Sequence, residues 1–231
     1  MNSDVKILAI VGMSGSGKST AVEYLTDHNI PKIYFGGIIY KAMAEAGITE
    51  VTPENQREFR EAIRAKEGND FVVKRAITDV RNLINAGQKR IVLDGVYSWT
   101  EYKILRKEFP TEMTVVAIVA PKSLRRKRLA ERPERPFNAQ EAAERDQTEI
   151  ENLEKGGPIA IADYYIYNNK DLKSFVVDFA ALMKEIGFVD WYERPTNFYP
   201  WTHYYPRRTS HGLKSTGWRC WIWLFCWRYF G

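Results

Sequence analysis

A glycine-rich loop between an apolar run and a helical segment is the feature that most constrains this chain. Residues 12–19 read Gly-Met-Ser-Gly-Ser-Gly-Lys-Ser, which fits the spacing G-x-x-x-x-G-K-[ST], and they follow the apolar run 7–11. A loop that wraps a polyphosphate points several backbone N–H groups inward, and glycine tolerates the dihedral angles and the close approach that this requires. The sequence therefore predicts a phosphate-binding loop, here called the phosphate loop (residues 12–19), between a strand and a helix.

The residue types in the phosphate loop indicate how a nucleoside triphosphate with Mg²⁺ would be held. The N-terminal end of the following helix adds positive partial charge. The Lys18 ammonium reaches the outer phosphates, and the Ser19 hydroxyl ligates Mg²⁺. The predicted nucleotide-binding residues of this stretch are Gly12, Ser14, Gly15, Ser16, Gly17, Lys18, Ser19 and Thr20.

Four further apolar runs predict the other strands of a parallel sheet. Each is too short for a helix, and helical segments that begin at the capping residues Thr52, Ser98 and Asn138 lie between them, the last running to about Glu154. This alternation predicts an α/β fold of three layers, with a five-stranded parallel sheet, helices on both faces and ligands at the carboxyl ends of the strands. The additional strands are expected at residues 33–35, 91–93, 115–119 and 164–167.

The charge and the composition divide the chain at residue 190. Residues 191–231 hold six bases, one acid and six of the seven tryptophans, so they account for the whole formal net charge of +5. The body, residues 1–190, is formally neutral, which argues against a nucleic-acid partner. No run of eighteen apolar residues predicts a transmembrane segment, and the two cysteines, Cys220 and Cys226, do not indicate a disulfide framework. We expect a cytoplasmic protein.

Asp94 ends the third predicted strand, next to Gly95. A carboxylate there would lie beside the phosphate loop, where it would hold a Mg²⁺-bound water or orient an acceptor. The alternative is an aspartate that caps the next turn. We predict the functional role and assign Asp94, with Lys18 and Ser19, to the catalytic and metal-binding residues.

A basic segment follows the fourth predicted strand, with seven bases and two acids in residues 121–135. Phosphoryl transfer needs cations against the transferring group, usually arginines on a mobile cover that excludes water. Helical spacing places Arg125, Arg128 and Arg132 on one face, with Arg128 as the first candidate for catalysis and Arg145 as a further one. For most of these bases a solvated helix face is the simpler explanation. Asn168, after the fifth strand, would bond a nucleobase edge or form an ordinary turn.

Residues 5–187 resemble the nucleotide kinases that include adenylate kinase and dephospho-CoA kinase, and most of all a branch of dephospho-CoA-kinase-related proteins from archaea and bacteria. The resemblance implies ATP and Mg²⁺ as ligands, a mobile lid formed by the arginine-rich segment, and an acceptor site under a helical flap after the second strand. The stretches that carry it are residues 12–20, 52–55, 92–95, 144–146 and 161–168.

The chain departs from these relatives where they hold the acceptor. In the relatives the second strand tends to end in Gly-Asp with an arginine nearby, whereas Gly37 and Tyr40 stand here. Tyr97 stands where relatives often carry an arginine behind Asp-Gly, and a tyrosine supplies one hydrogen bond and no charge. Tyr40, Tyr97 and Trp99 would either stack on a flat group of the acceptor or pack under the flap.

A second resemblance concerns the end of the body. Similar kinase-like domains precede the catalytic domain of some deoxycytidylate deaminases, and Arg194-Pro195-Thr196 stands where that junction would fall. The zinc-binding motifs of a deaminase are absent. Three explanations of the tail, residues 191–231, stay open: it docks on a partner or membrane surface, it packs on the kinase core, or it is an out-of-frame translation. The absence of alanine and the crowded tryptophans favour the out-of-frame translation.

These observations give one leading hypothesis and one rival. The leading hypothesis is a kinase that transfers the γ-phosphoryl group of ATP to a small-molecule acceptor, with a nucleotide or dephospho-CoA as candidates. The rival is a catalytically weak domain that senses a nucleotide and regulates a deaminase, fused to it or present as a partner. The arginine-rich segment and Asp94 favour the kinase, whereas the departures at Gly37, Tyr40 and Tyr97 favour the sensor.

Overall fold

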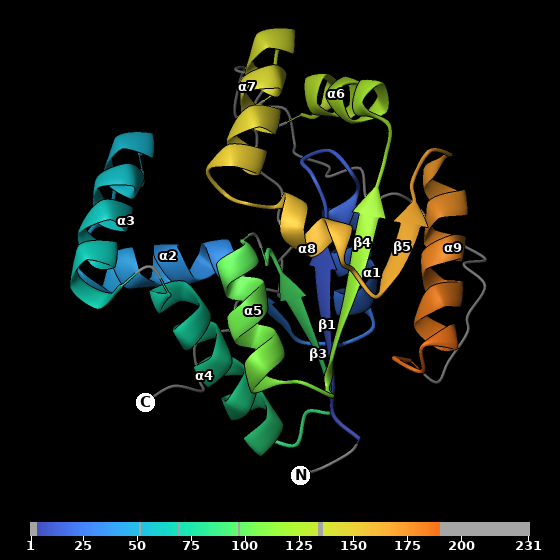
Figure 1. The fold of residues 1–231 in the computed structure, drawn as a ribbon, viewed down its shortest axis with the longest axis horizontal. Coiled ribbons are helices and arrows are strands. Elements are labelled where there is room, and N and C mark those ends of the chain that lie inside the picture. Colours follow the sequence, from blue (N-terminus) through green and yellow to red (C-terminus); the bar gives the residue numbers. More distant parts are fainter. Residues whose placement is uncertain (1–3, 51, 69, 97, 134–135, 190–231) are drawn as a thin grey trace, which may run out of the picture. The chain divides into compact units, whose positions relative to one another are not determined.

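The computed structural model describes residues 4–50, 52–68, 70–96, 98–133 and 136–189 (Figure 1). The predicted domain boundary at residue 190, the tail and Tyr97 lie outside these residues and stay predictions. None of the helices described in these ranges is both long and apolar enough to cross a membrane.

Five parallel strands form one sheet in the order β2-β3-β1-β4-β5, which confirms the predicted α/β fold. Each predicted strand is present within a few residues of its expected bounds, except that Phe35 begins a helix instead of ending the second strand. Because the strands are parallel, their carboxyl ends meet at one edge of the sheet. The strands are β1 (Lys6–Val11), β2 (Lys32–Tyr34), β3 (Arg90–Asp94), β4 (Met113–Val119) and β5 (Tyr164–Tyr167).

Helices cover both faces of this sheet. The helices α1 (Lys18–Asp27) and α9 (Leu172–Glu185) lie on one face. The helices α4 (Phe71–Asn85), α5 (Trp99–Glu108) and α8 (Gly156–Ala160) lie on the other (Figure 1). Two more stand over the carboxyl ends of the strands, where the sequence predicted a lid. The helices are α1 (Lys18–Asp27), α2 (Phe35–Glu45), α3 (Pro53–Glu67), α4 (Phe71–Asn85), α5 (Trp99–Glu108), α6 (Lys122–Glu131), α7 (Ala139–Glu151), α8 (Gly156–Ala160) and α9 (Leu172–Glu185).

The sheet forms the middle of a buried core. Residues of β1 alternate between its two faces, so that Ile7 and Ala9 join the cluster that α4 and α5 cover. On α4, Val73, Ala76 and Val80 are fully buried at spacings of three and four, which is the pattern of a helix with one apolar face. Burial on both faces of the sheet explains why the inner strands β1, β3 and β4 read as continuous apolar runs, whereas the edge strands β2 and β5 are partly exposed.

The predicted helix starts are confirmed by their capping contacts. Ser98 and Asn138 each form a capping box with the glutamate three residues later, and the Asn55 N–H donates to Thr52 Oγ1 at 3.1 Å. The predicted end of the helix after Asn138 was wrong. It ends at Glu151, because Glu154 takes a left-handed backbone conformation (φ 50°) and the chain turns into the short α8.

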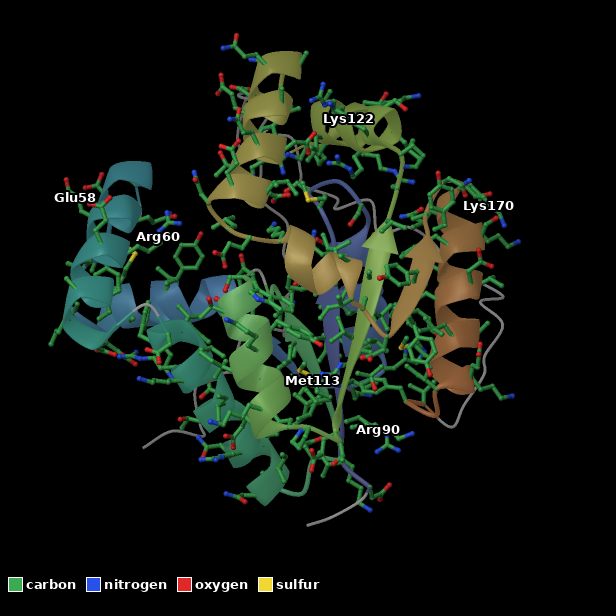
Figure 2. All side chains as sticks on the ribbon, in the orientation of Figure 1. Glu58, Arg60, Arg90, Met113, Lys122 and Lys170 are labelled. Carbon is green, nitrogen blue, oxygen red and sulfur yellow. The ribbon has the colours of Figure 1, made fainter. Side chains whose placement is uncertain are left out.

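Figure 2 shows which end of the sheet faces the lid, defined here as α6 and α7. Arg90 and Met113 are the first residues of β3 and β4, and they lie at the end of the sheet away from Lys122, the first residue of α6. The carboxyl ends of the strands, and the phosphate loop that follows β1, therefore lie on the lid side.

Candidate functional site

A cavity of about 410 Å³ opens beside the phosphate loop at the carboxyl ends of the strands. Seven of the predicted site residues line it, and these are Ser14, Gly15, Lys18, Ser19, Asp94, Arg132 and Arg145. The lining also includes charged and aromatic residues that the sequence did not single out, namely Glu23, Lys32, Tyr34 and Lys155.

The glycines of the phosphate loop are required by close backbone contacts as well as by their dihedral angles. Gly15 has φ 78°, and a Cβ atom there would lie 2.6 Å from the carbonyl oxygen of Arg125. Gly17 has φ 108°, and a Cβ atom there would lie 2.3 Å from Nδ2 of Asn168. The loop is therefore held against α6 on one side and against the end of β5 on the other, which leaves no space for side chains at these positions.

Lys18 begins α1 and lines the cavity, as its proposed contact with phosphates requires. Its ammonium donates to the Met13 carbonyl oxygen at 3.0 Å, across the mouth of the loop. Burial, together with the positive charge of Lys155, lowers the pKa of Lys18 to about 8. A cation held this far from its ordinary pKa gains from a nearby anion, because the anion compensates the cost of burial.

Asp94 is the last residue of β3 and lines the same cavity as Lys18 and Ser19. Burial raises the pKa of the Asp94 carboxyl above its ordinary value, and the charges of Lys32 and Lys18 oppose that shift. The predicted juxtaposition of a carboxylate with the phosphate loop is present. The described residues do not gather three or more His, Cys, Asp or Glu side chains into a metal-binding group. Mg²⁺ does not need one, because it commonly binds through one or two protein oxygens together with substrate phosphates.

Arg125 and Arg128 bind the phosphate loop itself. The Arg125 guanidinium is buried and donates to the Ser14 carbonyl oxygen at 3.0 Å and to Asp146 Oδ1 at 2.7 Å. Arg128 donates to Asn168 Oδ1 at 3.0 Å, and its other amino group lies 3.5 Å from the Gly15 carbonyl oxygen. Neither arginine is among the described residues that line the cavity. In this arrangement both hold the loop in place instead of closing over a transferring group.

Asn168 is buried and has both ends of its amide engaged. Its Nδ2 donates to the Ser16 carbonyl oxygen at 2.8 Å, and its Oδ1 accepts from Arg128. These contacts join the end of β5 to the phosphate loop, so the side chain positions the loop here.

Arg132 and Arg145 do face the cavity. Arg132 follows the last residue of α6, and its guanidinium carbon lies 4.3 Å from the centroid of the Phe137 ring. Arg145 lies on α7 and its Nε donates to Glu149 Oε1 at 3.2 Å. Of the four predicted lid arginines, these two are the ones that a ligand in the cavity would meet.

Glu149 has no local signal in the sequence and was not predicted, although its carboxylate accepts two hydrogen bonds from the phosphate loop. Its carboxylate is fully buried and accepts from the Ser14 N–H at 2.9 Å, from Ser14 Oγ at 2.6 Å, and from Arg145 and Lys155. Burial alone would raise the pKa of Glu149, but Lys155 and the two Ser14 donors lower it to about 2. The carboxylate is therefore charged at neutral pH.

The aromatic residues near the predicted acceptor site have different surroundings. Trp99 stacks on Tyr102, with ring centroids 5.2 Å apart, and lies so close to Gly157 that a Cβ atom there would be 2.7 Å from the ring. Trp99 therefore packs against Tyr102 of α5 and against α8. Tyr40 is 40 % exposed and remains available to a ligand. Gly37 lies against the ring of Tyr34. A Cβ atom added at Gly37 would lie 3.0 Å from Cδ1 of that ring, which accounts for a glycine at this position.

Comparisons with known proteins agree with this geometry. The family model AAA_18, described as an AAA domain, matches residues 8–152. A UPF0200 protein of Thermococcus kodakarensis is 33 % identical over 183 residues, which cover 78 % of this chain and 97 % of that protein. A UPF0200 protein of Methanosarcina barkeri is 32 % identical over 181 residues, covering 78 % and 95 %.

Solved structures show the same fold at low sequence identity. A dephospho-CoA kinase from Campylobacter jejuni superimposes with a TM-score of 0.52 and 17 % identity, covering 78 % of this chain and 96 % of that one. A shikimate kinase from Bacteroides thetaiotaomicron gives a TM-score of 0.50 and 10 % identity, covering 78 % and 98 %. The kinase-like fold that the sequence resemblance implied is thereby confirmed. With the phosphate loop and Asp94 inside the matched region, the chain belongs to the AAA_18 family of AAA domains and, like its archaeal relatives, to the UPF0200 family.

Proposed function

We propose that this protein transfers the γ-phosphoryl group of ATP to a small acceptor. The observation that carries the proposal is the meeting of the phosphate loop, Lys18, Ser19 and Asp94 at one cavity. Phosphoryl transfer requires little covalent chemistry from a protein and depends on positioning and charge. A phosphate-binding loop with a cation and a carboxylate at the same cavity meets those two requirements.

The donor set in the cavity fits a Mg²⁺–nucleotide complex. The phosphate loop presents backbone N–H groups at the start of a ten-residue helix, and Lys18 adds a full positive charge. Ser19 and Asp94 supply the hydroxyl and carboxylate oxygens that would hold Mg²⁺, directly or through water. When bound, Mg²⁺ would neutralise charge on the outer phosphates. In our proposal Lys18 and the loop hold these phosphates in line with the acceptor.

The rest of the cavity favours an acceptor that carries negative charge. Lys32 and Arg145 line the wall, together with Lys155, so positive side chains reach it from β2, from α7 and from the segment before α8. The sequence departures at Gly37 and Tyr97 removed charges that relatives place nearby. In our proposal Lys32 takes over the contact with an anionic acceptor, for which a nucleotide or dephospho-CoA remains the candidate.

A nucleotide-sensing domain without transfer is the second candidate. The specific observation in its favour is Gly37, which accommodates the Tyr34 ring at the end of β2, where relatives carry charged residues. Such a domain would bind the triphosphate at the phosphate loop and would show no turnover that depends on an acceptor.

One experiment separates the two candidates. The full-length chain is incubated with Mg-ATP and a panel of nucleosides, nucleoside monophosphates and dephospho-CoA, and ADP release is followed. A kinase releases ADP faster with one acceptor class, and Lys18→Ala abolishes that increase while Lys173→Ala, on the exposed side of α9, preserves it. Binding of ATP without stimulation by any acceptor in the panel would reject the kinase and favour the sensor.

A further inference from the structure

The carboxylate of Glu149 lies where the phosphate loop offers hydrogen-bond donors. It accepts the Ser14 N–H at 2.9 Å and the Ser14 hydroxyl at 2.6 Å, although the two residues are 135 positions apart in the chain. Glu149 comes from α7, in the lid, so this contact joins the lid to the loop. An anion from the protein therefore uses donors of the loop that a bound phosphate would also use.

The cations around Glu149 are suited to a phosphate as well as to a carboxylate. Lys155 is 3 % exposed and pairs with Glu149, and Arg145 donates to the same oxygen, Oε1. Charge-assisted bonds of this kind are made equally by carboxylate and phosphate oxygens. If Glu149 moved away alone, the buried ion pair between Glu149 and Lys155 would be lost, which is costly. A phosphate group that arrived at the same place would compensate that loss.

The position of this anion along a triphosphate follows from its neighbours. Lys18 is the residue of the loop motif that reaches the β- and γ-phosphates, and it lines the same cavity as Arg145 and Lys155, the two cations that bind Glu149. Ser14 also lines the cavity, four residues before Lys18. The outer phosphates, and not the phosphate next to the ribose, are therefore the ones that would compete with Glu149.

We propose that Glu149 is an internal anion that holds the place of the terminal phosphate in the nucleotide-free protein, and that ATP binds by displacing it. Ser14, Arg145 and Lys155 then form the subsite for the terminal phosphate, and the release of Glu149 uncouples α7 from the loop. This inference rests on the proposed binding of ATP and adds a residue that limits it. Because only the fraction of molecules with Glu149 displaced is competent, the apparent affinity for ATP is lower than the intrinsic affinity.

The direct test compares the binding of a non-hydrolysable ATP analogue to three forms of the full-length chain by calorimetry. Glu149→Gln removes the competing charge, and Glu151→Gln makes the same charge change at an exposed position of the same helix. We expect Glu149→Gln to bind the analogue about tenfold more tightly than the wild type, and Glu151→Gln to match the wild type. Equal affinity in the two variants, or weaker binding by Glu149→Gln, would overturn the inference.

A second variant keeps the test informative if Glu149→Gln does not fold. Glu149→Asp retains the negative charge beside Lys155 but is one methylene shorter, so its hydrogen bonds to Ser14 are weaker. We expect this variant to bind the analogue a few-fold more tightly than the wild type. Affinity below that of the wild type would overturn the inference. Failure of the ATP binding on which this inference rests gives a different result, because then no form, including the wild type and Glu151→Gln, binds the analogue.

Discussion

The ion pairs of Glu149 predict a specific acid sensitivity of the fold. The pKa of Glu149 falls from an ordinary value of 4.5 to about 2 in the folded protein. As the pH falls, the unfolded chain therefore binds a proton at this position before the folded chain does. The stabilisation is complete above pH values of about 4.5 and is lost as the pH falls toward about 2.

The magnitude follows from these two pKa values. The whole contribution is about 3 kcal/mol, of which about 1 kcal/mol is lost by about pH 4 and about 2 kcal/mol by about pH 3. The perturbation is Glu149→Gln, which cannot ionise, and the assay is urea unfolding of the wild type and the variant across this range. Other carboxylates, including Asp94 with its raised pKa, titrate alike in both proteins and cancel in the difference.

The expected result is a stability difference that narrows with acid. The free energy of unfolding of the wild type should exceed that of Glu149→Gln by less and less as the pH falls. We expect this difference to shrink by about 1 kcal/mol between neutral pH and about pH 4, and by about 2 kcal/mol at about pH 3. A difference in unfolding free energy that stays constant over the same range would mean that Ser14 and Lys155 do not hold Glu149 as a buried carboxylate.

Three further predictions concern the phosphate loop, Asn168 and Asp94. Gly15→Ala should destabilise the fold by about 2 kcal/mol or more in urea unfolding. The control Gly87→Ala should destabilise it by about 1 kcal/mol, because Gly87 has a similar positive φ but no atom lies within 4 Å of an added Cβ. Equal losses of stability would contradict the contact of Gly15 with Arg125. Asn168→Ala should weaken binding of the ATP analogue by about tenfold in calorimetry, because the loop loses its anchor, and unchanged affinity would argue against this. Asp94→Asn should lower acceptor-dependent turnover by about 100-fold while analogue binding changes only a few-fold, and retained turnover would exclude Asp94 from catalysis.

The strands and the phosphate loop could be predicted because their signals are local. A short apolar run before a glycine-rich stretch contains all the information that places β1, the loop and α1 in order. Capping residues such as Ser98 and Asn138 act within three positions, so the helix starts are also readable from the sequence. The end of α7 could not be read in the same way, because it depends on the left-handed backbone conformation of Glu154. Glutamate is not a residue type that indicates such a conformation.

The inner contacts of the site depend on distant parts of the chain and had no local signal. Helical spacing grouped Arg125 with Arg132, yet the fold brings α6 so close to the loop that Arg125 pairs with Asp146 and Ser14, while Arg132 remains at the cavity. Glu149 stands four residues after Arg145, an ordinary spacing for a surface ion pair. Its contact with Ser14 arises only when the lid lies over the loop.

The fate of the γ-phosphoryl group tests the central claim most directly. The full-length chain is incubated with Mg²⁺, ATP labelled at the γ-phosphate, and the acceptor panel, and the products are separated. We predict label in one class of anionic acceptor, with ADP formed in equal amount, and no such product with Lys18→Ala. Label that stays in ATP or appears only as inorganic phosphate would contradict it.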